Sequence, residues 1–557
     1  MKRYTVGVDF GTLSGRAVVL DTQSGKTLAS AVMDYPHGVM DTALPDGTPV
    51  PPHSAFQHPK DYLLVLGKVI REALSQAEIS PEEVAGLGID FTSCTLLVAD
   101  ENGEPLCMNP KYASRPQAYV KLWKHHGSQE EAVRMNAIAQ QRGEPWLAIC
   151  GGKISPEWAL PKIYETLRRD EEIFFAADSF CEAGEWLTSR LTGETVRAAG
   201  FAGYKFNWSA AEGFPSNEYL TAVDPRLDGL VGKKLCDEIR SVEATAGRLS
   251  EEGAALTGLC KGTPVALPML DAEAAMPALN VTEEGKGLLV LGTSGVLLLH
   301  DRKVKTVPGI CGLVADGVIP GMCTYEAGQA GFGDCFEWFS HNCVPAHYRE
   351  AATREGKNIH AYLRERAQKL KIGESGLLAL DWFNGNRSIL QDADLSGMIL
   401  GLHIGTRPEE IYRALIEATA FGMRRIIENY AEYGITLTQL GAAGGIAQKD
   451  EMLMQIYADV LDREICVFGT DQAGALGSAI YAAVAGGLFA TVTDASCALS
   501  VKPTRCYRPI PENVQAYNGL YDEYRRLYEY FGEGGNDVMR RLRKLSQSTK
   551  YGECPLV

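Results

Sequence analysis

The same local pattern occurs in two distant parts of this sequence and constrains the fold more than any other feature. Residues 5–20 and 287–299 each contain a β-branched or apolar strand, a turn rich in Gly, Thr and Ser, and a second apolar strand. Residues 87–93 also resemble residues 6–12 almost position by position. A strand–turn–strand unit in each half of a long chain predicts a duplicated fold with a cleft between its halves.

The length of 557 residues supports two large domains, because a single hydrophobic core stops growing well below this size. Strands and helices alternate throughout, which is typical of an α/β protein. A polar, Gly-bearing stretch near residue 283 predicts the boundary, which gives domains 1–283 and 284–557. We expect strands at residues 86–90, 95–98 and 440–443, the first two joined by a turn, and helices at residues 408–433, 450–461 and 511–545.

Charge and cysteine usage exclude several classes of protein. The net charge of −16 argues against nucleic-acid binding, since such a surface repels phosphate backbones. The 14 cysteines include no C-x-x-C pair, so most are expected to be reduced thiols. The chain begins in a strand pattern without a signal peptide, and we expect a cytoplasmic protein. Residues 472–493 carry no charge but consist largely of Gly and Ala, which favours a buried helix against a sheet over a membrane span.

The Gly, Thr and Ser-rich turns can present backbone N–H groups and hydroxyls to a phosphate. A single turn of this kind is more often an ordinary hairpin, but one in each half could hold a triphosphate from both sides. No G-x-x-x-x-G-K-[ST] stretch occurs, so a P-loop is absent and an actin-like mode of ATP binding is left. The candidate phosphate-binding residues are Gly11, Thr12, Ser14, Arg16, Gly292 and Thr293.

Carboxylates stand at the ends of two predicted strands. Asp9 precedes the first turn and can hold Mg²⁺, although a turn cap is the simpler role. Asp271 lies between an apolar strand and a helix of small residues, where it is placed either as a general base or as the cap of that helix. Gly444 and Gly445 could let an adenine ring lie against bare backbone, or could simply form a turn into the next helix.

Together these motifs resemble those of the FGGY carbohydrate kinase family over almost the whole chain. The similarity lies in residues 8–16 and 291–294 for the phosphates, 397–417 in the C-terminal pattern and 444–459 for adenosine. The resemblance implies two actin-like ATPase (ribonuclease H-like) domains flanking a catalytic cleft. It also implies ATP and Mg²⁺ as cofactors, Lys449 beside the nucleotide, and a homo-oligomer, expected to be a dimer.

Within this family, several stretches resemble the members that phosphorylate ribulose: residues 90–95, 115–127, 155–158, 204–205 and 325–329. That resemblance implies transfer of a phosphoryl group from ATP to L- or D-ribulose, giving ribulose 5-phosphate in pentose (L-arabinose) catabolism. Asp271 would act as the base, Asp9 would serve Mg²⁺, and the sugar site would be lined by Ser93, Lys205, Asp271 and Glu326. Glu273 departs from the pattern, because a His is expected at that position.

Other interpretations stay open at this point. Another polyol or ketose, such as xylulose, glycerol, erythritol or fuculose, could be the substrate of the same fold. A chaperone or filament ATPase of the actin-like class could also carry the two phosphate turns. Such an ATPase would have no need of Asp271 or of the stretches around Trp123, Lys205 and Glu326, so these residues favour a sugar kinase.

Overall fold

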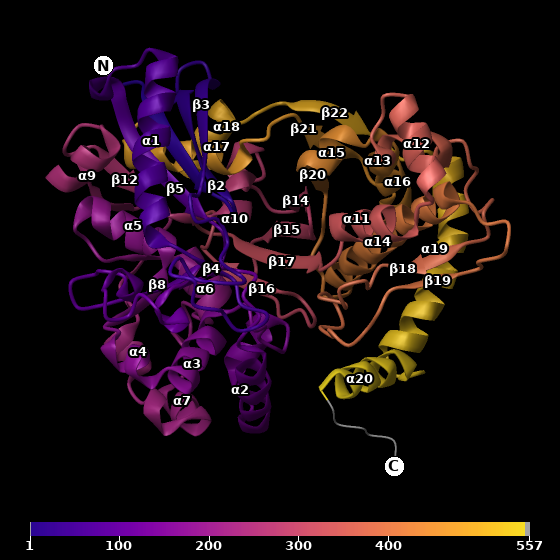
Figure 1. Cartoon of the computed structure of the whole chain (residues 1–557). Coiled ribbons are helices and arrows are strands. Elements are labelled where there is room, and N and C mark those ends of the chain that lie inside the picture. Colours follow the sequence, from indigo (N-terminus) through magenta and orange to yellow (C-terminus); the bar gives the residue numbers. More distant parts are fainter. Residues whose placement is uncertain (1, 552–557) are drawn as a thin grey trace.

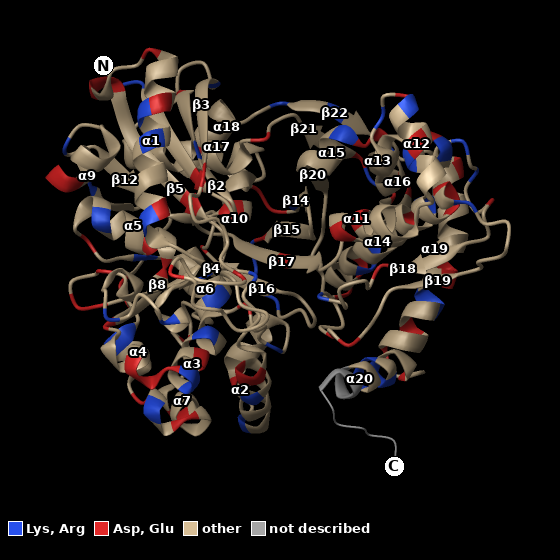
Figure 2. Cartoon of the chain, viewed as in Figure 1, with Lys and Arg blue, Asp and Glu red and all other residues tan. Residues whose placement is uncertain are grey.

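The computed structural model describes residues 2–551 and consists of two α/β halves that lie side by side (Figure 1). Each half is built on a twisted, mixed β-sheet, and helices cover the sheets. Acidic and basic residues are intermixed along the helices of both halves (Figure 2).

The first sheet has the strand order β11-β12-β5-β1-β2-β3, and β13 pairs with the end of β5. β1 runs antiparallel to β2 and parallel to β5, and β-branched and apolar residues bury both faces of these central strands. The strands are β1 (Tyr4–Phe10), β2 (Ser14–Asp21), β3 (Lys26–Asp34), β5 (Val84–Phe91), β11 (Thr245–Arg248), β12 (Pro264–Ala266) and β13 (Met269–Leu270).

The second sheet, in the order β16-β17-β15-β14-β20-β21-β22, repeats this topology. In both sheets an antiparallel triplet (β3-β2-β1 or β17-β15-β14) is followed by two parallel strands (β5-β12 or β20-β21). The predicted duplication is therefore confirmed at the level of strand order. The strands are β14 (Lys286–Leu291), β15 (Gly295–Asp301), β16 (Gly312–Ala315), β17 (Cys323–Gln329), β20 (Gln439–Ala443), β21 (Ile465–Phe468) and β22 (Pro503–Tyr507).

Two helices of small residues, α10 (Asp271–Ala278) and α17 (Ala473–Ala485), pack against each other beside both sheets. α17 lies directly on β1 and β5, where Gly7 and Gly88 permit the approach because a Cβ atom would collide with the helix backbone. The uncharged stretch is thus a buried helix on a sheet, as predicted. It also means that a helix from the second half of the sequence completes the core of the first sheet.

One predicted strand pair is wrong. Residues 95–98 do form a strand, β6 (Leu96–Ala99), but it does not pair with β5. It belongs to a separate small sheet, β4-β7-β6-β8, whose partners include residues far away in the sequence. The additional strands are β4 (Phe56–Gln57), β7 (Val120–Lys121), β8 (Ser179–Glu182), β9 (Arg197–Ala198), β10 (Ile239–Arg240), β18 (Leu378–Leu380) and β19 (Met398–Leu400).

The helices of the first half surround its two larger sheets, and α2, α3, α4 and α7 form a lobe at one end (Figure 1). Their bounds are α1 (Pro59–Ala77), α2 (Gln129–Arg142), α3 (Ala159–Arg169), α4 (Glu171–Ala176), α5 (Ala183–Thr192), α6 (Ala199–Phe206), α7 (Asn217–Val223), α8 (Leu230–Lys234) and α9 (Glu251–Thr257).

The predicted helices of the second half are present as α14 (Pro408–Glu432) and α16 (Glu451–Leu461). The predicted helix over residues 511–545 is instead two helices, α19 (Pro511–Gly532) and α20 (Val538–Tyr551), separated by a Gly-rich turn. α19 buries a row of tyrosines, Tyr517, Tyr521, Tyr524 and Tyr528. The others are α11 (Gly333–Cys343), α12 (Ala346–Arg354), α13 (Ile359–Ala367), α15 (Gly445–Lys449) and α18 (Val492–Leu499).

Among the cysteines, Cys466 and Cys506 face each other on β21 and β22 and form a disulfide, while the remaining described cysteines are free. The expectation of mostly reduced thiols therefore holds, with this one pair as the exception. No helix within residues 2–551 is long and apolar enough to cross a membrane.

Candidate active site

Three carboxylates meet at the carboxyl end of the first sheet. Asp9 and Asp90 occupy paired positions on the parallel strands β1 and β5, and β13 runs parallel to the end of β5 immediately before Asp271. Because carboxyl ends of parallel strands share one edge, the register brings the three groups together. Asp90 was not predicted as a site residue, although its stretch repeats that of Asp9 and offered the signal.

These carboxyl groups influence one another. Burial and then the charge of Asp9 raise the pKa of Asp90 well above its ordinary value, and Ser478 Oγ donates a hydrogen bond to Asp90 Oδ2 (2.6 Å). Burial, followed by Asp9, raises the pKa of Asp271 to about 7. Asp271 is the first residue of α10, and its Oδ1 accepts a hydrogen bond from the Ala272 N–H (2.8 Å). A carboxyl group with a pKa near neutrality is suited to take up a proton during a reaction.

The first turn joins β1 to β2 and is held from several sides. The Gly11 N–H donates to Ser14 O (3.0 Å), and Tyr35 Oη donates to Gly11 O (3.0 Å). Thr12 accepts two hydrogen bonds, from Gln57 Nε2 to its carbonyl (2.8 Å) and from Trp123 Nε1 to its hydroxyl (3.1 Å). The Thr12 hydroxyl keeps its proton free to donate to a ligand.

The second turn joins β14 to β15 in the same way. The Gly292 N–H donates to Ser294 O (3.1 Å), and Thr293 O accepts from the N–H of Phe332 (3.1 Å). Gly444 lies beside this turn with a φ of +104°, and a Cβ atom there would collide with Leu291 O. Gly444 therefore satisfies both a backbone conformation and a close approach that only glycine permits. Gly445 begins α15, with open space where a Cβ would lie.

The loop around Asp471 connects Arg16, next to the first turn, with helix α15. Arg16, next to the first turn, approaches Asp9 Oδ2 with its Nε (3.4 Å) and Asp471 O with its Nη1 (3.4 Å). From the other half, Gln448 Nε2 donates to Asp471 Oδ1 (3.0 Å). The side chain of the predicted nucleotide residue Lys449 forms no hydrogen bond or ion pair within the described chain. Only its carbonyl does, accepting from Arg364 Nη1 (3.1 Å).

The predicted sugar-binding residues come from both halves. Lys205, near the end of α6, forms an ion pair with Glu326 on β17 (Nζ–Oε2 3.0 Å), and its ammonium lies 5.4 Å from the Trp158 ring centroid. Burial alone would lower the pKa of Lys205, but Glu326 and other nearby acidic groups together outweigh it and hold that pKa above its ordinary value. Ser93 Oγ is buried without a hydrogen-bond partner, as expected of a group that awaits a ligand.

Glu273 lies among these charges as well. It is buried on α10, and burial followed by Glu326 raises its pKa to about 8, so it is largely protonated at neutral pH. Glu326 also acts on the pKa of Asp271. The pair of Lys205 and Glu326 is therefore adjacent to the carboxylate cluster, and the first turn borders the same cluster because Asp9 lies on β1 just before it.

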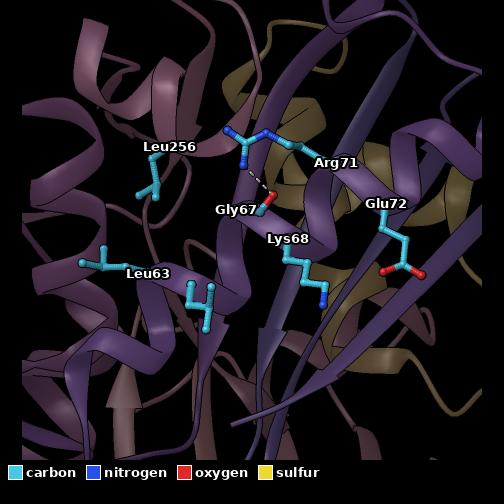
Figure 3. A pocket seen from close by; sticks show the side chains of 7 residues that line it. Leu63, Gly67, Lys68, Arg71, Glu72 and Leu256 are labelled. Carbon is cyan, nitrogen blue, oxygen red and sulfur yellow. Dashed lines mark hydrogen bonds between the residues drawn. The ribbon is translucent and has the colours of Figure 1, made fainter. Parts of the chain in front are cut away.

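Two other features carry no comparable chemistry. A shallow hollow between α1 and α9 is lined by Leu63, Gly67, Arg71 and Leu256, and Figure 3 shows Arg71 donating to Gly67 O in its wall. It contains none of the site residues. Among the described residues, the only three metal-ligand side chains within 4.8 Å of one another are Glu464, Cys466 and Cys506, and two of these form the disulfide.

Comparison with solved structures identifies the fold. The crystal structure of xylulose kinase from Rhodospirillum rubrum superimposes with a TM-score of 0.76 at 23% identity, covering 94% of this chain and 98% of that one. The fold is therefore that of the two-domain sugar kinases.

Family models match residues 4–276 and 287–486, described as the N-terminal and C-terminal domains of the FGGY family of carbohydrate kinases. The chain belongs to this family. Ribulokinase from Bacillus licheniformis is 48% identical over 538 residues (96% of this chain, 97% of the relative). Ribulokinase from Geobacillus thermodenitrificans is 46% identical over 554 residues, or 99% and 98% of the two chains.

Proposed function

We propose that this protein transfers the γ-phosphoryl group of ATP to ribulose and forms ribulose 5-phosphate, as a ribulokinase of pentose (L-arabinose) catabolism. The observation that carries the proposal is the position of Asp271. Its carboxyl group, with a pKa of about 7, adjoins both Asp9 beside the first phosphate turn and Glu326 of the polar pair. The identity of 46–48% to ribulokinases over almost the full length supports ribulose as the sugar.

In this reaction Asp271 accepts the proton of the terminal sugar hydroxyl while that oxygen attacks the γ-phosphorus. The backbone N–H groups and hydroxyls of the two turns, with Thr12 and Thr293, bind the phosphate oxygens and stabilise the charge that develops on them. Arg16 is positioned to add a positive charge on this side. Gly444 and Gly445 offer bare backbone against which the adenine ring can lie.

The residues present fit Mg²⁺. Carboxylate oxygens are the protein ligands that Mg²⁺ prefers, and it usually takes one or two of them together with water and substrate phosphates. Asp9 would hold the ion, directly or through water, and Asp90 beside it leaves Oδ1 buried without a hydrogen-bond partner. When bound, Mg²⁺ neutralises charge on the transferring phosphoryl group.

Lys205, Glu326 and Ser93 would bind the sugar hydroxyls. A buried ion pair and a buried hydroxyl without a partner are costly unless polar groups of a ligand satisfy them. These groups lie outside both phosphate turns, which separates recognition of the sugar from that of the nucleotide.

The proposal extends to features beyond the site itself. We include a division into domains 1–283 and 284–557, a dimeric assembly and a cytoplasmic location. The match of separate family models to the two halves supports the division. Sedimentation of the purified protein tests the dimer.

The decisive assay measures ATP turnover with and without a panel of L- and D-ribulose, xylulose, erythritol and glycerol. A ribulokinase consumes ATP only when a sugar is present and has its highest kcat/KM with ribulose. Turnover that is independent of sugar would instead favour a chaperone or filament ATPase, and a preference for another member of the panel would replace ribulose as the substrate.

A further inference from the structure

A second ion pair joins the two halves beside Lys205 and Glu326. Glu157, from the first half, faces Arg387, from the loop between β18 and β19 of the second half (Oε1–Nη2 3.6 Å). The polarity of this pair is opposite to that of Lys205 and Glu326. The first half supplies the cation of the Lys205 pair but the anion of the Arg387 pair. The four charges cancel, so together they form a neutral polar surface contributed equally by both halves.

The loop that carries Arg387 is fixed in place. Gln391 Nε2 donates to Cys150 O of the first half (3.2 Å) and to Ile310 O (2.9 Å). The next residue after Arg387, Ser388, accepts a hydrogen bond from the Gly328 N–H (3.1 Å), two positions beyond Glu326 on β17. Arg387 is thereby held next to the sugar-binding pair by contacts that do not involve its own side chain.

The side chain of Arg387 has unused hydrogen-bonding capacity. Within residues 2–551 its guanidinium makes only the 3.6 Å ion pair, which is longer than a hydrogen bond, although it offers five N–H donors. The Arg387 side chain is only 26% exposed and that of Glu157 22%. Glu157 Oε1 is also 2.9 Å from His126 Nε2. A partly buried guanidinium whose donors meet no protein acceptor within hydrogen-bond distance is available to bind a ligand.

Contacts place the two ion pairs side by side, since the Lys205 ammonium lies 5.4 Å from the ring of Trp158, the residue after Glu157, and the Gly328 N–H on β17 donates to Ser388, the residue after Arg387. Among nearby charges, those of Asp9 and Glu326 raise the pKa of Asp271 most. The nearby charges that lower the pKa of Glu157 most are those of Arg387, His126 and Lys205. The pair of Lys205 and Glu326 therefore adjoins both Asp271 and the pair of Glu157 and Arg387. A sugar whose terminal hydroxyl meets Asp271 would extend past the first pair, so that its other end meets the second.

We propose that Arg387 and Glu157 bind the end of the ketose opposite the phosphorylated carbon and set specificity for that end. The guanidinium would donate to the ketone oxygen and its neighbouring hydroxyl, and the Glu157 carboxylate would accept from a hydroxyl. This inference rests on the proposed function, since it assigns the orientation of the sugar in the same site. A bidentate donor opposite a carbonyl discriminates against substrates that lack it.

The alternative is that this ion pair only holds the halves together. Gln391 provides the matched control, because it docks the same loop through hydrogen bonds and carries no charge. A purely structural role predicts that Arg387→Ala and Gln391→Ala have the same effect on every substrate.

The test compares Arg387→Ala, Arg387→Lys, Glu157→Gln and Gln391→Ala on ribulose and on ribitol, which has a hydroxyl in place of the ketone. We expect Arg387→Ala to raise KM for ribulose about 10–100-fold with a much smaller change in kcat, and to reduce the preference for ribulose over ribitol by about tenfold or more. Arg387→Lys keeps the charge but loses the planar fork, so it should restore only part of this preference.

Glu157→Gln is the conservative variant if loss of the arginine impairs folding, and it should raise KM for both substrates. Binding of a non-hydrolysable ATP analogue, measured by calorimetry without sugar, should match the wild type in each case. An unchanged ribulose-to-ribitol preference in Arg387→Ala, or changes equal to those of Gln391→Ala, would overturn the inference. Failure of the wild-type protein to phosphorylate ribulose would instead refute the proposed function, so the two failures are distinguishable.

Discussion

Asp90 lies directly opposite Asp9 in the parallel register of β1 and β5, and its own carboxylate is held by Ser478 from α17. The strand that supplies the proposed Mg²⁺ ligand is thus paired with a strand that supplies a second carboxyl group. The helix that packs on both comes from the far end of the sequence. The two carboxyl groups therefore lie between the first turn and a helix from the second half of the sequence. Substitutions can test each of them separately.

Asp9→Asn and Asp90→Asn should behave differently although the two residues are neighbours. Burial and Asp9 raise the pKa of Asp90 well above its ordinary value, which favours the neutral carboxyl group, and Asn is a close substitute for that form. We expect Asp90→Asn to keep kcat within about threefold of the wild type. Asp9→Asn should lower kcat about tenfold or more and increase the Mg²⁺ concentration needed for half-maximal rate. Titration of the rate with Mg²⁺ in both variants measures this, and equal effects would contradict the assignment.

Asp271→Asn removes the proposed base while keeping its shape. We expect kcat to fall about 10²–10⁴-fold, while calorimetry still detects binding of an ATP analogue. A variant with near wild-type kcat would show that another group accepts the proton. Thr293→Val, which alters the phosphate turn and leaves the base intact, is a useful comparison because it should raise KM for ATP.

Asp271→Asn should also stabilise the folded protein at alkaline pH. Asp271 has a pKa of about 7 in the folded protein against an ordinary value of 3.8, so the folded state binds more protons between these values. Its contribution to stability therefore falls as pH rises from about 4 to 7. Asp271→Asn avoids that loss, and Tm should exceed the wild-type value by about 2–4 °C at pH 8 but not at pH 4. The same Tm difference at both pH values would argue against a raised pKa.

Asp271 also determines how the rate depends on pH. Its deprotonation, which lowers the stability of the fold, is required for activity. Only the deprotonated form of Asp271 can accept a proton, so kcat/KM should decrease about tenfold per pH unit below a pKa of about 7 and level off above it. Initial rates from pH 5 to 9 with saturating Mg²⁺ measure the profile. A flat profile down to pH 5 would contradict Asp271 as the base.

Lys205→Ala and Glu326→Ala should impair sugar binding without impairing nucleotide binding. Each removes one partner of an enclosed ion pair, and an unpaired buried charge costs about 1–3 kcal/mol. We expect KM for ribulose to rise about 10–100-fold, with a smaller decrease in kcat, because sugar hydroxyls develop little charge during transfer. Loss of ATP-analogue binding with unchanged ribulose binding would refute this division of roles.

Local patterns in the sequence predicted most of the elements on which the site depends. Turn composition identified the turns between β1 and β2 and between β14 and β15, and an apolar strand before a helix of small residues placed Asp271 at a strand end. Long-range pairing was not predictable in the same way. Residues 95–98 joined another sheet because their partners, β7 and β8, are distant in the sequence. Arg387 acquires its position through contacts of its loop with Cys150, Ile310 and Gly328, and no motif marks it.

The central claim is that a phosphoryl group passes from ATP to the terminal hydroxyl of ribulose with Asp271 as the base. The most direct measurement incubates the purified protein with ATP, Mg²⁺ and ribulose and identifies the product by ³¹P and ¹³C NMR, with Asp271→Asn as the control. The account predicts ribulose 5-phosphate and ADP in equal amounts from the wild type, and almost none from the variant. ADP with free phosphate and unmodified sugar, or a phosphate on another carbon, would contradict it.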